Sequence, residues 1–442
     1  MKKTLFFSLF AALYANAMTL DETIDKALLH NNTLKKVSLE VAQSKENRAS
    51  KQAQNYGRVD FMASYDHYNN ARTLAPLTPM QIVGGTGAYE MATTKDMIST
   101  GIAYNVVLFN GFAQQNSYKI SDIMYKNSII KSKLSKEELI YNVRSLYLSI
   151  LSLEEQLEAQ KANTISQKSL YEKIEASYKL GSKSKLDTLK SKNSYEVSLS
   201  NEQKIAANIN TLKTTLTMLM GGEDFDSAEH IDIALEESEE KHHDIESLKR
   251  YEMYELQTRI AEKKYKSADA AYYPIIDFSA YYGYNFGPND TTNTFPTTGE
   301  TFIEKGDFNS ENIWQAGIHL KWNILDFGSK SATSQKEKLS MMSSQLDQAD
   351  MKLELKKNLA IAEDKLALAK ADYNSALSQH ELLEEIVKVE SLKYESNAVT
   401  LSDLLDSKAK EKIAYAKMIS SKYAYQQAKY YIDYLLERGE KN

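Results

Sequence analysis

Apolar residues recur at alternating steps of four and three over two long stretches of the chain. The two sets are Leu139, Val143, Leu146, Ile150, Leu153 and Leu157, and Leu355, Leu359, Ala362, Leu366, Ala369 and Tyr373. This spacing is that of the a/d seam of a coiled coil. It predicts two long helices, over about residues 113–179 and 329–395, each on the order of 100 Å at ~1.5 Å per residue.

The two stretches belong to an internal duplication with an offset of 216 residues, in which YKLGSKSKLDTLKSK from Tyr178 returns as YESNAVTLSDLLDSK from Tyr394. Gly181 is the only glycine between Phe112 and Met220, a stretch without proline, and it aligns with Asn397. Glycine and asparagine most readily adopt positive φ at a helix end. We therefore predict two helical hairpins, with returning arms over about 184–220 and 401–437. A kink in one longer helix is the alternative.

Ahead of each long helix the period of the pattern falls to two. Apolar and polar residues alternate over 59–67, 98–108, 278–286 and 314–324. Each segment has about ten residues, the length of a tilted strand that spans a membrane, and aromatic residues lie near its ends. We expect four strands of a membrane barrel, with a half-buried soluble sheet as the alternative.

Segments rich in Thr, Gly and Pro, residues 69–97 and 287–311, connect the paired strands and hold four of the five prolines. We expect them to be extracellular loops, with the helices on the periplasmic side. Four strands cannot close a barrel, and an open edge in lipid costs several kcal/mol for each unpaired backbone group. The sheet is therefore expected to close between subunits, with eight strands in a dimer or twelve in a trimer.

Composition excludes several classes of protein. The chain has 442 residues, 42% of them hydrophobic and 26% charged, with a formal net charge of −6. A net negative charge does not indicate the basic surface that binds nucleic acid, so no nucleic-acid partner is expected. The absence of cysteine excludes disulfides, thiolate metal sites and cysteine nucleophiles.

The first residues have the organisation of a secretory signal. Lys2 and Lys3 precede an apolar run that ends on the small-residue pattern Ala15-Asn16-Ala17. We expect the mature chain to begin at Met18. A membrane anchor is the alternative, but the run is shorter than the ~20 residues that span a bilayer, and no later run approaches that length.

The order and duplication of these elements resemble a known family. The strand exit reads Leu108-Phe109-Asn110-Gly111 in the first half and Ile324-Leu325-Asp326-Phe327-Gly328 in the second. The hairpin tip reads G-x5-D-x-L from Gly181 to Leu189 and is echoed from Asn397 to Leu405. Each motif is weak alone, but together they make the chain similar to the TolC-type outer-membrane efflux family (outer membrane factors) over essentially all of its mature length.

This resemblance implies an α+β membrane protein with a duplicated strand-strand-helix-helix unit. Four strands per subunit would contribute to a trimeric 12-stranded β-barrel, continuous with a long α-helical coiled-coil periplasmic tunnel. The implied partners are two further copies of the chain, outer-membrane lipid, a periplasmic adaptor (membrane fusion) protein, and an inner-membrane pump of the RND, ABC or MFS type. The implied function is that of a passive exit duct for tripartite efflux or type I secretion in a Gram-negative outer membrane, with no enzyme activity, cofactor or metal.

The expected domain organisation follows the duplication. The segments are a signal peptide (1–17), N-terminal helices (18–57), strands 1–2 (58–109, loop 69–97), helical hairpin 1 (110–220), an equatorial segment (221–250), a helix (251–274), strands 3–4 (275–325, loop 287–311), helical hairpin 2 (326–437) and a C-terminal tail (438–442).

The resemblance also implies roles for residues at the tunnel tip. Asp187 and Tyr394 stand at the gate aspartate and gate tyrosine, Asp403 and Asp406 match ring aspartates, and Val399 replaces the gate arginine. The expected tip and adaptor contacts are Gly181, Ser182, Leu186, Leu189, Asn397, Ala398, Leu401 and Leu405. Alternatively, the aspartates are ordinary helix N-terminal residues that the helix dipole favours.

Other candidate sites are weaker. The group Glu239, Glu240, His242, His243 and Asp244 offers metal-ligand types but lies in an acidic run, so a solvated segment is favoured. Gly84-Gly85-Thr86-Gly87 lacks the lysine and helix of a phosphate loop. No catalytic arrangement stands out, which disfavours an envelope enzyme. The four amphipathic strands favour an export duct over a periplasmic adaptor or structural protein of the envelope. The sequence does not specify the cargo.

Overall fold

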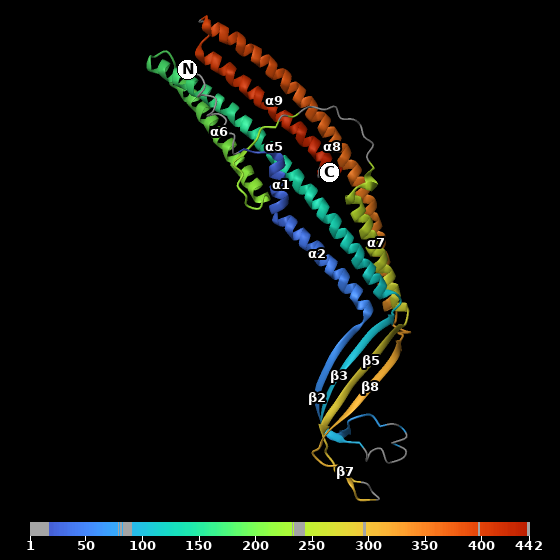
Figure 1. The fold of residues 1–442 in the computed structure, drawn as a ribbon. Helices are drawn as coiled ribbons and strands as arrows, with labels where there is room; N and C mark the ends of the chain where they lie inside the picture. The colour runs from blue at the N-terminus through green and yellow to red at the C-terminus, as the bar shows by residue number, and fades with distance from the viewer. Residues whose placement is uncertain are drawn as a thin grey trace, which may run out of the picture. The chain divides into compact units, whose positions relative to one another are not determined.

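The computed structural model describes residues 17–77, 79, 82, 91–231, 233, 244–294, 298–396 and 398–439. Outside this part of the chain lie most of the expected signal peptide, the glycine-rich run 84–87, the candidate ligands at 239–243 and the tip residue Asn397. The chain forms two compact units (Figure 1). The helical unit is Met1–Val41, Asn127–Glu255 and Leu346–Asn442, and the sheet unit is Ala42–Lys126 and Leu256–Gln345.

The sheet unit contains one four-stranded antiparallel sheet. Its strands are β2 (Arg58–Thr73), β3 (Thr93–Phe109), β5 (Ile275–Pro288) and β8 (Phe308–Lys321), hydrogen-bonded in the order β2-β3-β5-β8. β2 and β8 are the edge strands, and the two halves of the duplication meet where β3 pairs with β5. A short ribbon of β6 (Asn293–Thr294) and β7 (Thr301–Ile303) lies in the second connection. The four strands expected from the alternating pattern are present.

The prediction of ten-residue strands and of connections over 69–97 and 287–311 is wrong. β2 and β3 have 16 and 17 residues, and β5 and β8 have 14 each. The ladder continues through polar residues as far as the pair of Thr73 with Thr93, past an irregularity after His67. Backbone hydrogen bonding needs no apolar alternation, so the pattern marks only part of each strand.

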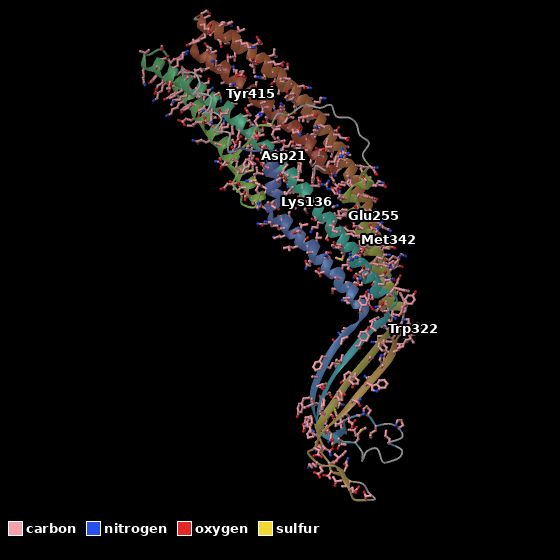
Figure 2. All side chains as sticks on the ribbon, viewed as in Figure 1. Asp21, Lys136, Glu255, Trp322, Met342 and Tyr415 are labelled. Carbon is pink, nitrogen blue, oxygen red and sulfur yellow. The ribbon has the colours of Figure 1, made fainter. Side chains whose placement is uncertain are left out.

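At its other end the sheet is shorter than the alternation suggests. β8 ends at Lys321, so Trp322 and Ile324 follow the strand instead of belonging to it. Trp322 lies just beyond the end of β8 (Figure 2). Its Nε1 donates a hydrogen bond to the Tyr272 carbonyl oxygen at 3.1 Å. Trp322 thus ties the segment after β8 to the backbone just before β5, whereas Ile324 is exposed.

Each half of the chain contains a long helix and a shorter returning helix. α5 (Ala113–Lys179) and α8 (Ser329–Glu395) have 67 residues each, and α6 (Lys185–Leu219) and α9 (Leu401–Leu435) have 35 each. Gln160 of α5 donates to the Ser198 carbonyl of α6 at 2.9 Å, and the Tyr171 and Tyr195 rings stack 6.4 Å apart. The reversal predicted at Gly181 is therefore confirmed, and the kinked single helix is excluded.

Shorter helices precede the strands. α1 (Leu20–His30) and α2 (Asn32–Ala53) come before β2, and α7 (Lys249–Asp269) comes before β5. Among the residues described, no helix is at once long and apolar enough to cross a bilayer.

The core of the helical unit lies around the predicted seam of α5. Val143 and Ile150 are fully buried and pack in one cluster with Leu216 of α6, Ala27 of α1 and Tyr423 of α9. Burial of one such aliphatic side chain stabilises the fold by about 1.5–3 kcal/mol. The heptad pattern therefore identifies the residues that join α5 to its neighbours.

Tyr147 connects this core to the start of the chain. Its hydroxyl lies 2.7 Å from the Met18 carbonyl oxygen and 2.8 Å from that of Glu229. These carbonyls flank a parallel pair of two-residue strands, β1 (Ala17–Met18) and β4 (Ser227–Ala228), which the sequence did not indicate. Burial raises the pKa of the Tyr147 hydroxyl, so the group stays a neutral donor.

The end of the chain is clamped onto α7. The Glu437 carboxylate accepts hydrogen bonds from the backbone N–H groups of Lys249 at 2.7 Å and Arg250 at 2.9 Å. A carboxylate is favourable at a helix N-terminus because it satisfies unpaired N–H groups and the helix dipole. This contact explains why α7 begins inside the segment 221–250, ahead of the expected boundary at 251.

Replacing Tyr147 with Phe should loosen the N-terminal segment without disturbing the coiled coil. The hydroxyl contact with two part-buried carbonyl oxygens is lost, while the Met18 carbonyl still accepts from the Glu229 N–H. A hydrogen bond of this kind typically contributes about 0.5–1.5 kcal/mol. We expect faster hydrogen exchange in peptides that cover α1 and β1, measured by mass spectrometry. Tyr195→Phe, in the stacked pair of α5 and α6, is the matched control, and equal effects of both changes would contradict the role of the hydroxyl.

Candidate functional site

The register of the sheet sorts its side chains onto two faces, because residues directly opposite each other in a ladder point to the same side. Phe61, Ile102, Tyr282 and Trp314 form one continuous row across all four strands. Two further rows on this side also hold aromatic and aliphatic residues, namely Val59, Tyr104, Ala280 and Ala316, and Tyr65, Ile98, Phe286 and Ser310. We call this side the apolar face.

The apolar face is exposed. Phe61 is 74% accessible and Trp314 72%. Soluble monomers rarely present a continuous apolar surface of this kind. A half-buried soluble sheet would cover this face, so its exposure favours contact with lipid.

The opposite side of the sheet, called the polar face, carries small and charged residues. Its members include Asp60, Ser64, Ser99, Gly101, Asp277, Ser279, Tyr281, Gly283, Asn285, Glu311, Gln315 and His319. The Tyr281 ring lies over two glycines of this face, since a Cβ placed on Gly101 would lie 2.5 Å from the Tyr281 hydroxyl oxygen. The face is suited to water.

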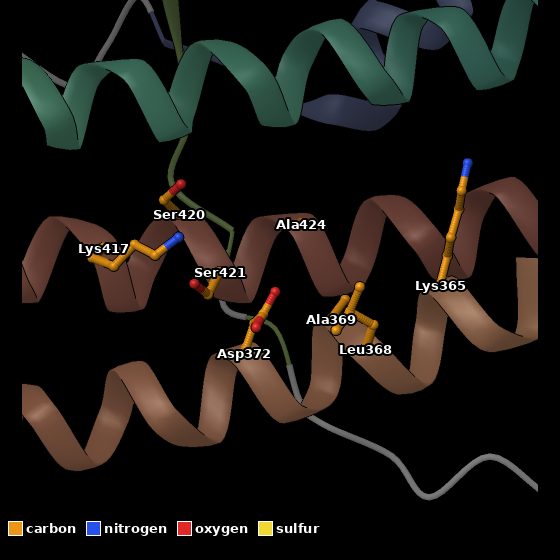
Figure 3. A pocket seen from close by; sticks show the side chains of 8 residues that line it. All are labelled: Lys365, Leu368, Ala369, Asp372, Lys417, Ser420, Ser421 and Ala424. Carbon is orange, nitrogen blue, oxygen red and sulfur yellow. The ribbon is translucent and has the colours of Figure 1, made fainter.

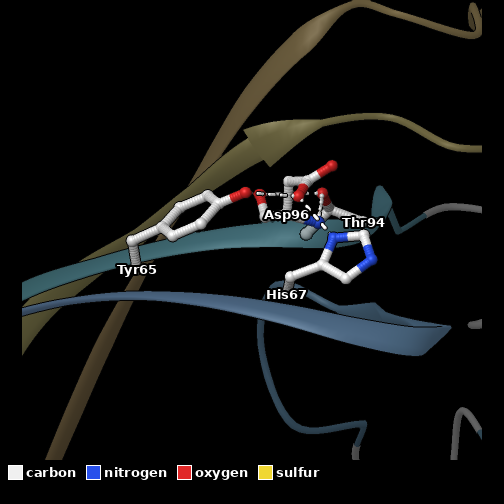
Figure 4. A network of polar contacts seen from close by, with 4 residues as sticks. All are labelled: Tyr65, His67, Thr94 and Asp96. Atoms are coloured by element: carbon white, nitrogen blue, oxygen red, sulfur yellow. Dashed lines mark hydrogen bonds and ion pairs between the residues drawn. The ribbon is translucent and has the colours of Figure 1, made fainter.

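The apolar face ends in a polar network next to the first connection (Figure 4). The Tyr65 hydroxyl donates to Asp96 Oδ1 at 2.7 Å, and His67 Nδ1 lies 2.7 Å from the same oxygen. His67 and Asp96 are paired in the ladder, and the strand register shifts immediately afterwards. This group of polar and ionisable side chains on the face marks the level at which apolar surroundings stop.

The two strand-exit motifs hold the backbone in a left-handed conformation. Gly111 and Phe112 have φ of 65° and 67°, and Phe327 and Gly328 have φ of 54° and 99°. Asn110 Oδ1 accepts from the Gln114 N–H at 3.2 Å, and an aspartate, at the equivalent place in the second half, accepts from the fourth residue beyond it at 2.7 Å. The repeated motif is therefore a turn that ends a strand and starts a long helix.

The hairpin tips repeat one set of backbone hydrogen bonds. Gly181 has φ of 76°, and the Ser182 N–H donates to the Ser177 carbonyl at 2.9 Å. At the second tip the Ala398 N–H donates to the Lys393 carbonyl at 2.8 Å, the equivalent pair at the offset of 216. These bonds close the last turn of each helix in the manner of a Schellman motif.

Two of the four residues predicted to form a gate, Asp187 and Asp403, belong to helix capping boxes within the protomer. Asp187 Oδ2 accepts from the Ser184 N–H at 3.2 Å and hydroxyl at 2.8 Å, while the Ser184 oxygen accepts from the Asp187 N–H. Asp403 forms the same capping box with Thr400, with distances of 2.9 Å and 2.6 Å. The alternative explanation of these aspartates as helix N-terminal residues is thus favoured by the geometry within one chain.

These hydrogen bonds fix the charge of both carboxylates. The bonds from Ser184 hold the pKa of Asp187 below its usual value, and those from Thr400 do the same for the pKa of Asp403. A smaller effect on Asp403 comes from the positive charge of Lys173 on α5. Both aspartates are therefore ionised at neutral pH. The S/T-x-x-D spacing at Ser184 and Thr400 could have shown this role in the sequence.

The other gate and tip residues are placed as follows. Asp406 forms an ion pair with Lys410 one turn later at 2.7 Å, and Tyr394 is exposed near the end of α8. Leu405 is half-buried, while its neighbour Leu404 is buried. The Leu401 side chain, like Asn397, lies outside the described part of the structure.

The first tip exposes apolar side chains. Leu180 is 84% accessible, Leu186 59% and Leu189 56%. The turn itself does not require these leucines, because Gly181 and the capping box supply its geometry.

α8 carries a second apolar stripe besides its contact with α9. Leu355, Ala362 and Ala376 are buried. A separate set at near-heptad spacing is exposed in the helical unit, namely Leu346, Leu353, Ile361, Leu368, Leu382 and Val389. An exposed heptad stripe is typical of a helix that packs against another chain.

A small cavity of about 150 Å³ lies between α8 and α9 (Figure 3). Lys365, Asp372, Lys417, Ser420 and Ser421 are among its lining residues. Pockets for drug-sized ligands have roughly 300–1,000 Å³. Within the part of the chain described, no three His, Cys, Asp or Glu side chains are grouped to hold a metal ion.

Comparison with known proteins is consistent across both halves of the chain. The family model described as outer membrane efflux protein matches residues 23–222 and 252–436. No curated protein matches the chain. The CmeC outer membrane channel of Campylobacter jejuni is similar with a TM-score of 0.74 at 15% identity, over 96% of this chain and 86% of that one.

Two further solved structures share the fold. The outer membrane protein VceC of Vibrio cholerae has a TM-score of 0.69 at 14% identity, with 95% of each chain covered. The open state of the MtrE outer membrane channel of Neisseria gonorrhoeae has a TM-score of 0.66 at 15% identity, over 95% of this chain and 88% of that one. With the family model matched in both duplicated halves, the chain belongs to the outer membrane efflux protein family.

Proposed function

We propose that the protein is the outer-membrane exit duct of a tripartite efflux system. In this role it passively conducts substrates that a periplasmic adaptor and an inner-membrane pump deliver. The observation that carries the proposal is the two-faced sheet, with an exposed apolar face that includes Phe61 and Trp314 and a polar face around Tyr281. A periplasmic adaptor or structural protein does not contact a lipid bilayer, so we would not expect it to expose an apolar face of this kind.

The proposal includes assembly into a trimer. β2 and β8 are sheet edges whose backbone groups need partners in hydrocarbon. Two copies would give eight strands and an interior filled by side chains, whereas three would give twelve strands around a lumen. The charged residues of the polar face, such as Asp60 and Asp277, require water, which favours three copies. The exposed stripe of α8 offers a matching contact between helices of neighbouring copies.

Adjacent residues on β8 provide the test. Trp314 lies on the apolar face and Gln315 on the polar face. Lysine at the midplane of a lipid-facing strand costs about 2–4 kcal/mol. We expect Trp314→Lys to abolish the heat-modifiable trimer in membrane extracts, seen by gel migration and native mass spectrometry.

Gln315→Lys is the matched control, because it adds the same charge one residue away. It should assemble, and it should shift the conductance in planar bilayers toward anions. A stable monomer in detergent for the unchanged protein would contradict the trimer, and normal assembly of Trp314→Lys would contradict the assignment of the faces.

We further propose that the hairpin tips form a cation-favouring constriction. Asp187, Asp403 and Asp406 together would place up to nine carboxylates around the axis of a trimer. Like charges held close raise one another's pKa, but the capping boxes lower that of Asp187 and Asp403. Asp187 and Asp403 therefore keep their negative charge at neutral pH, while Asp406 is paired with Lys410, and Val399 supplies no positive partner at its own position.

Changing Asp403 and Asp406 together to Asn should weaken cation preference and remove block by a trivalent cation in planar-bilayer recordings. Trimer assembly should persist. Asp347→Asn with Asp350→Asn, two exposed aspartates of α8 at the same spacing, is the control. If block survives the change at 403 and 406, the tip carboxylates are helix caps and nothing more.

A further inference from the structure

The two hairpin tips share a backbone but differ in charge. The first tip, residues 179–192, contains five lysines and one aspartate, a net charge of +4. The second tip, residues 395–408 at the offset of 216, contains one glutamate, two aspartates and one lysine, a net charge of −2. The two duplicated tips thus share the backbone turn but differ in surface charge.

Most of the lysines of the first tip have no ion-pair partner among the residues that the structure describes, although Lys183 and Lys190 exert a small electrostatic effect on Asp187. Lys179 pairs with Glu175 in the preceding turn at 3.4 Å. The other four lysines are exposed, and none forms an ion pair with any residue that the structure describes; they are Lys183, Lys185, Lys190 and Lys192. The only carboxylate of this tip, Asp187, has its Oδ2 oxygen in the Ser184 capping box.

The second tip keeps a net negative charge, although two of its three carboxylates make contacts within the protomer. Asp406 pairs with Lys410 at 2.7 Å, and Asp403 is held by Thr400 and lies in the field of Lys173, a residue of the first hairpin. Asp403 and Asp406 therefore have contacts within the protomer, whereas four of the five lysines of the first tip form no ion pair with the residues that the structure describes.

The lysines of the first tip surround apolar side chains. Leu180, Leu186 and Leu189 are exposed on the same short segment as Lys183 and Lys185. Leucines that the turn does not need, set among uncompensated cations, suit a partner surface that is apolar at its centre and acidic around it. Net repulsion between lysines disfavours contact between two such tips.

From this pattern we infer that the first tip is the docking site for an acidic, leucine-rich helical hairpin of the periplasmic partner, and that the two tips of a protomer are unequal docking sites. The inference rests on the proposed function, because it assumes that the tips meet a partner. It adds the chemistry of that partner. Charge complementarity would also set which of the two hairpins each partner copy contacts first, through electrostatic steering.

The probe is a pair of designed antiparallel helical hairpins with the same leucines, one with glutamates and one with lysines around its turn. Binding to the full-length protein in detergent is followed by fluorescence anisotropy. At about 0.15 M salt we expect the acidic hairpin to bind about tenfold tighter or more than the basic one, with the difference fading as salt rises.

The test variant reverses the free cations of the tip, as Lys183→Glu, Lys185→Glu and Lys190→Glu together. It should invert the preference between the two probes. The control reverses three exposed lysines away from the tip, Lys133→Glu, Lys204→Glu and Lys357→Glu, and should leave the preference unchanged. Equal binding of both probes to the unchanged protein, or an equal loss in the control, overturns the inference.

Cell wall and lipid are two other anionic partners that the first tip could bind. Parallel binding measurements with soluble peptidoglycan fragments and with phosphatidylglycerol vesicles distinguish them from a protein partner. Binding of either that is lost in the tip variant, without a preference between the hairpins, would overturn the inference in favour of cell wall or lipid. Planar-bilayer conductance distinguishes failure of the docking inference from failure of the proposed function. If the tip variant still conducts, only the docking inference fails; if the unchanged protein forms no channel, the proposed function fails.

Discussion

The packing of α5 is the interaction on which the helical unit depends. Val143, Tyr147 and Ile150 of this helix are fully buried and contact α1, α6 and α9 or the segments beside them. Tyr147 adds a polar contact to the same layer, since its hydroxyl reaches the carbonyls of Met18 and Glu229. One helix therefore fixes the start of the chain, its own returning arm and the returning arm of the other hairpin. Its seam also has the clearest heptad pattern in the first half of the sequence.

The sequence predicts the long helices well because their signal is local and repeated. The seam residues and the break at Gly181 define α5 and α6, and the duplication extends the assignment to α8 and α9. Strand ends are predicted less well, because the ladder from His67 to Thr73 depends on a partner strand and not on alternation. The β1–β4 pair and the contact of Glu437 with α7 join residues about 190–210 positions apart and leave no periodic trace.

In the candidate site, too, features set by neighbouring residues could be predicted from the sequence, whereas features set by contacts between distant segments could not. Residue types at the tips were identified from the repeat, and the contacts of Asp187 and Asp403 with Ser184 and Thr400 show the capping boxes that the S/T-x-x-D spacing also indicates. The two faces of the sheet needed the register, because a single strand shows alternation without showing which rows align across four strands. Subunit assembly and the identity of the partner depend on other chains, so neither the sequence of one chain nor its fold contains them directly.

The equal lengths of the two hairpins limit how this chain can change during evolution. Both long arms have 67 residues and both returning arms have 35, so the two tips end at the same distance along their helices. Inserting one heptad into both arms of one hairpin would keep its seam in phase and lengthen it by about 10 Å. That hairpin would then extend past its counterpart, and a partner could no longer touch both. A change in reach therefore requires four coordinated insertions, two in each half of the duplication.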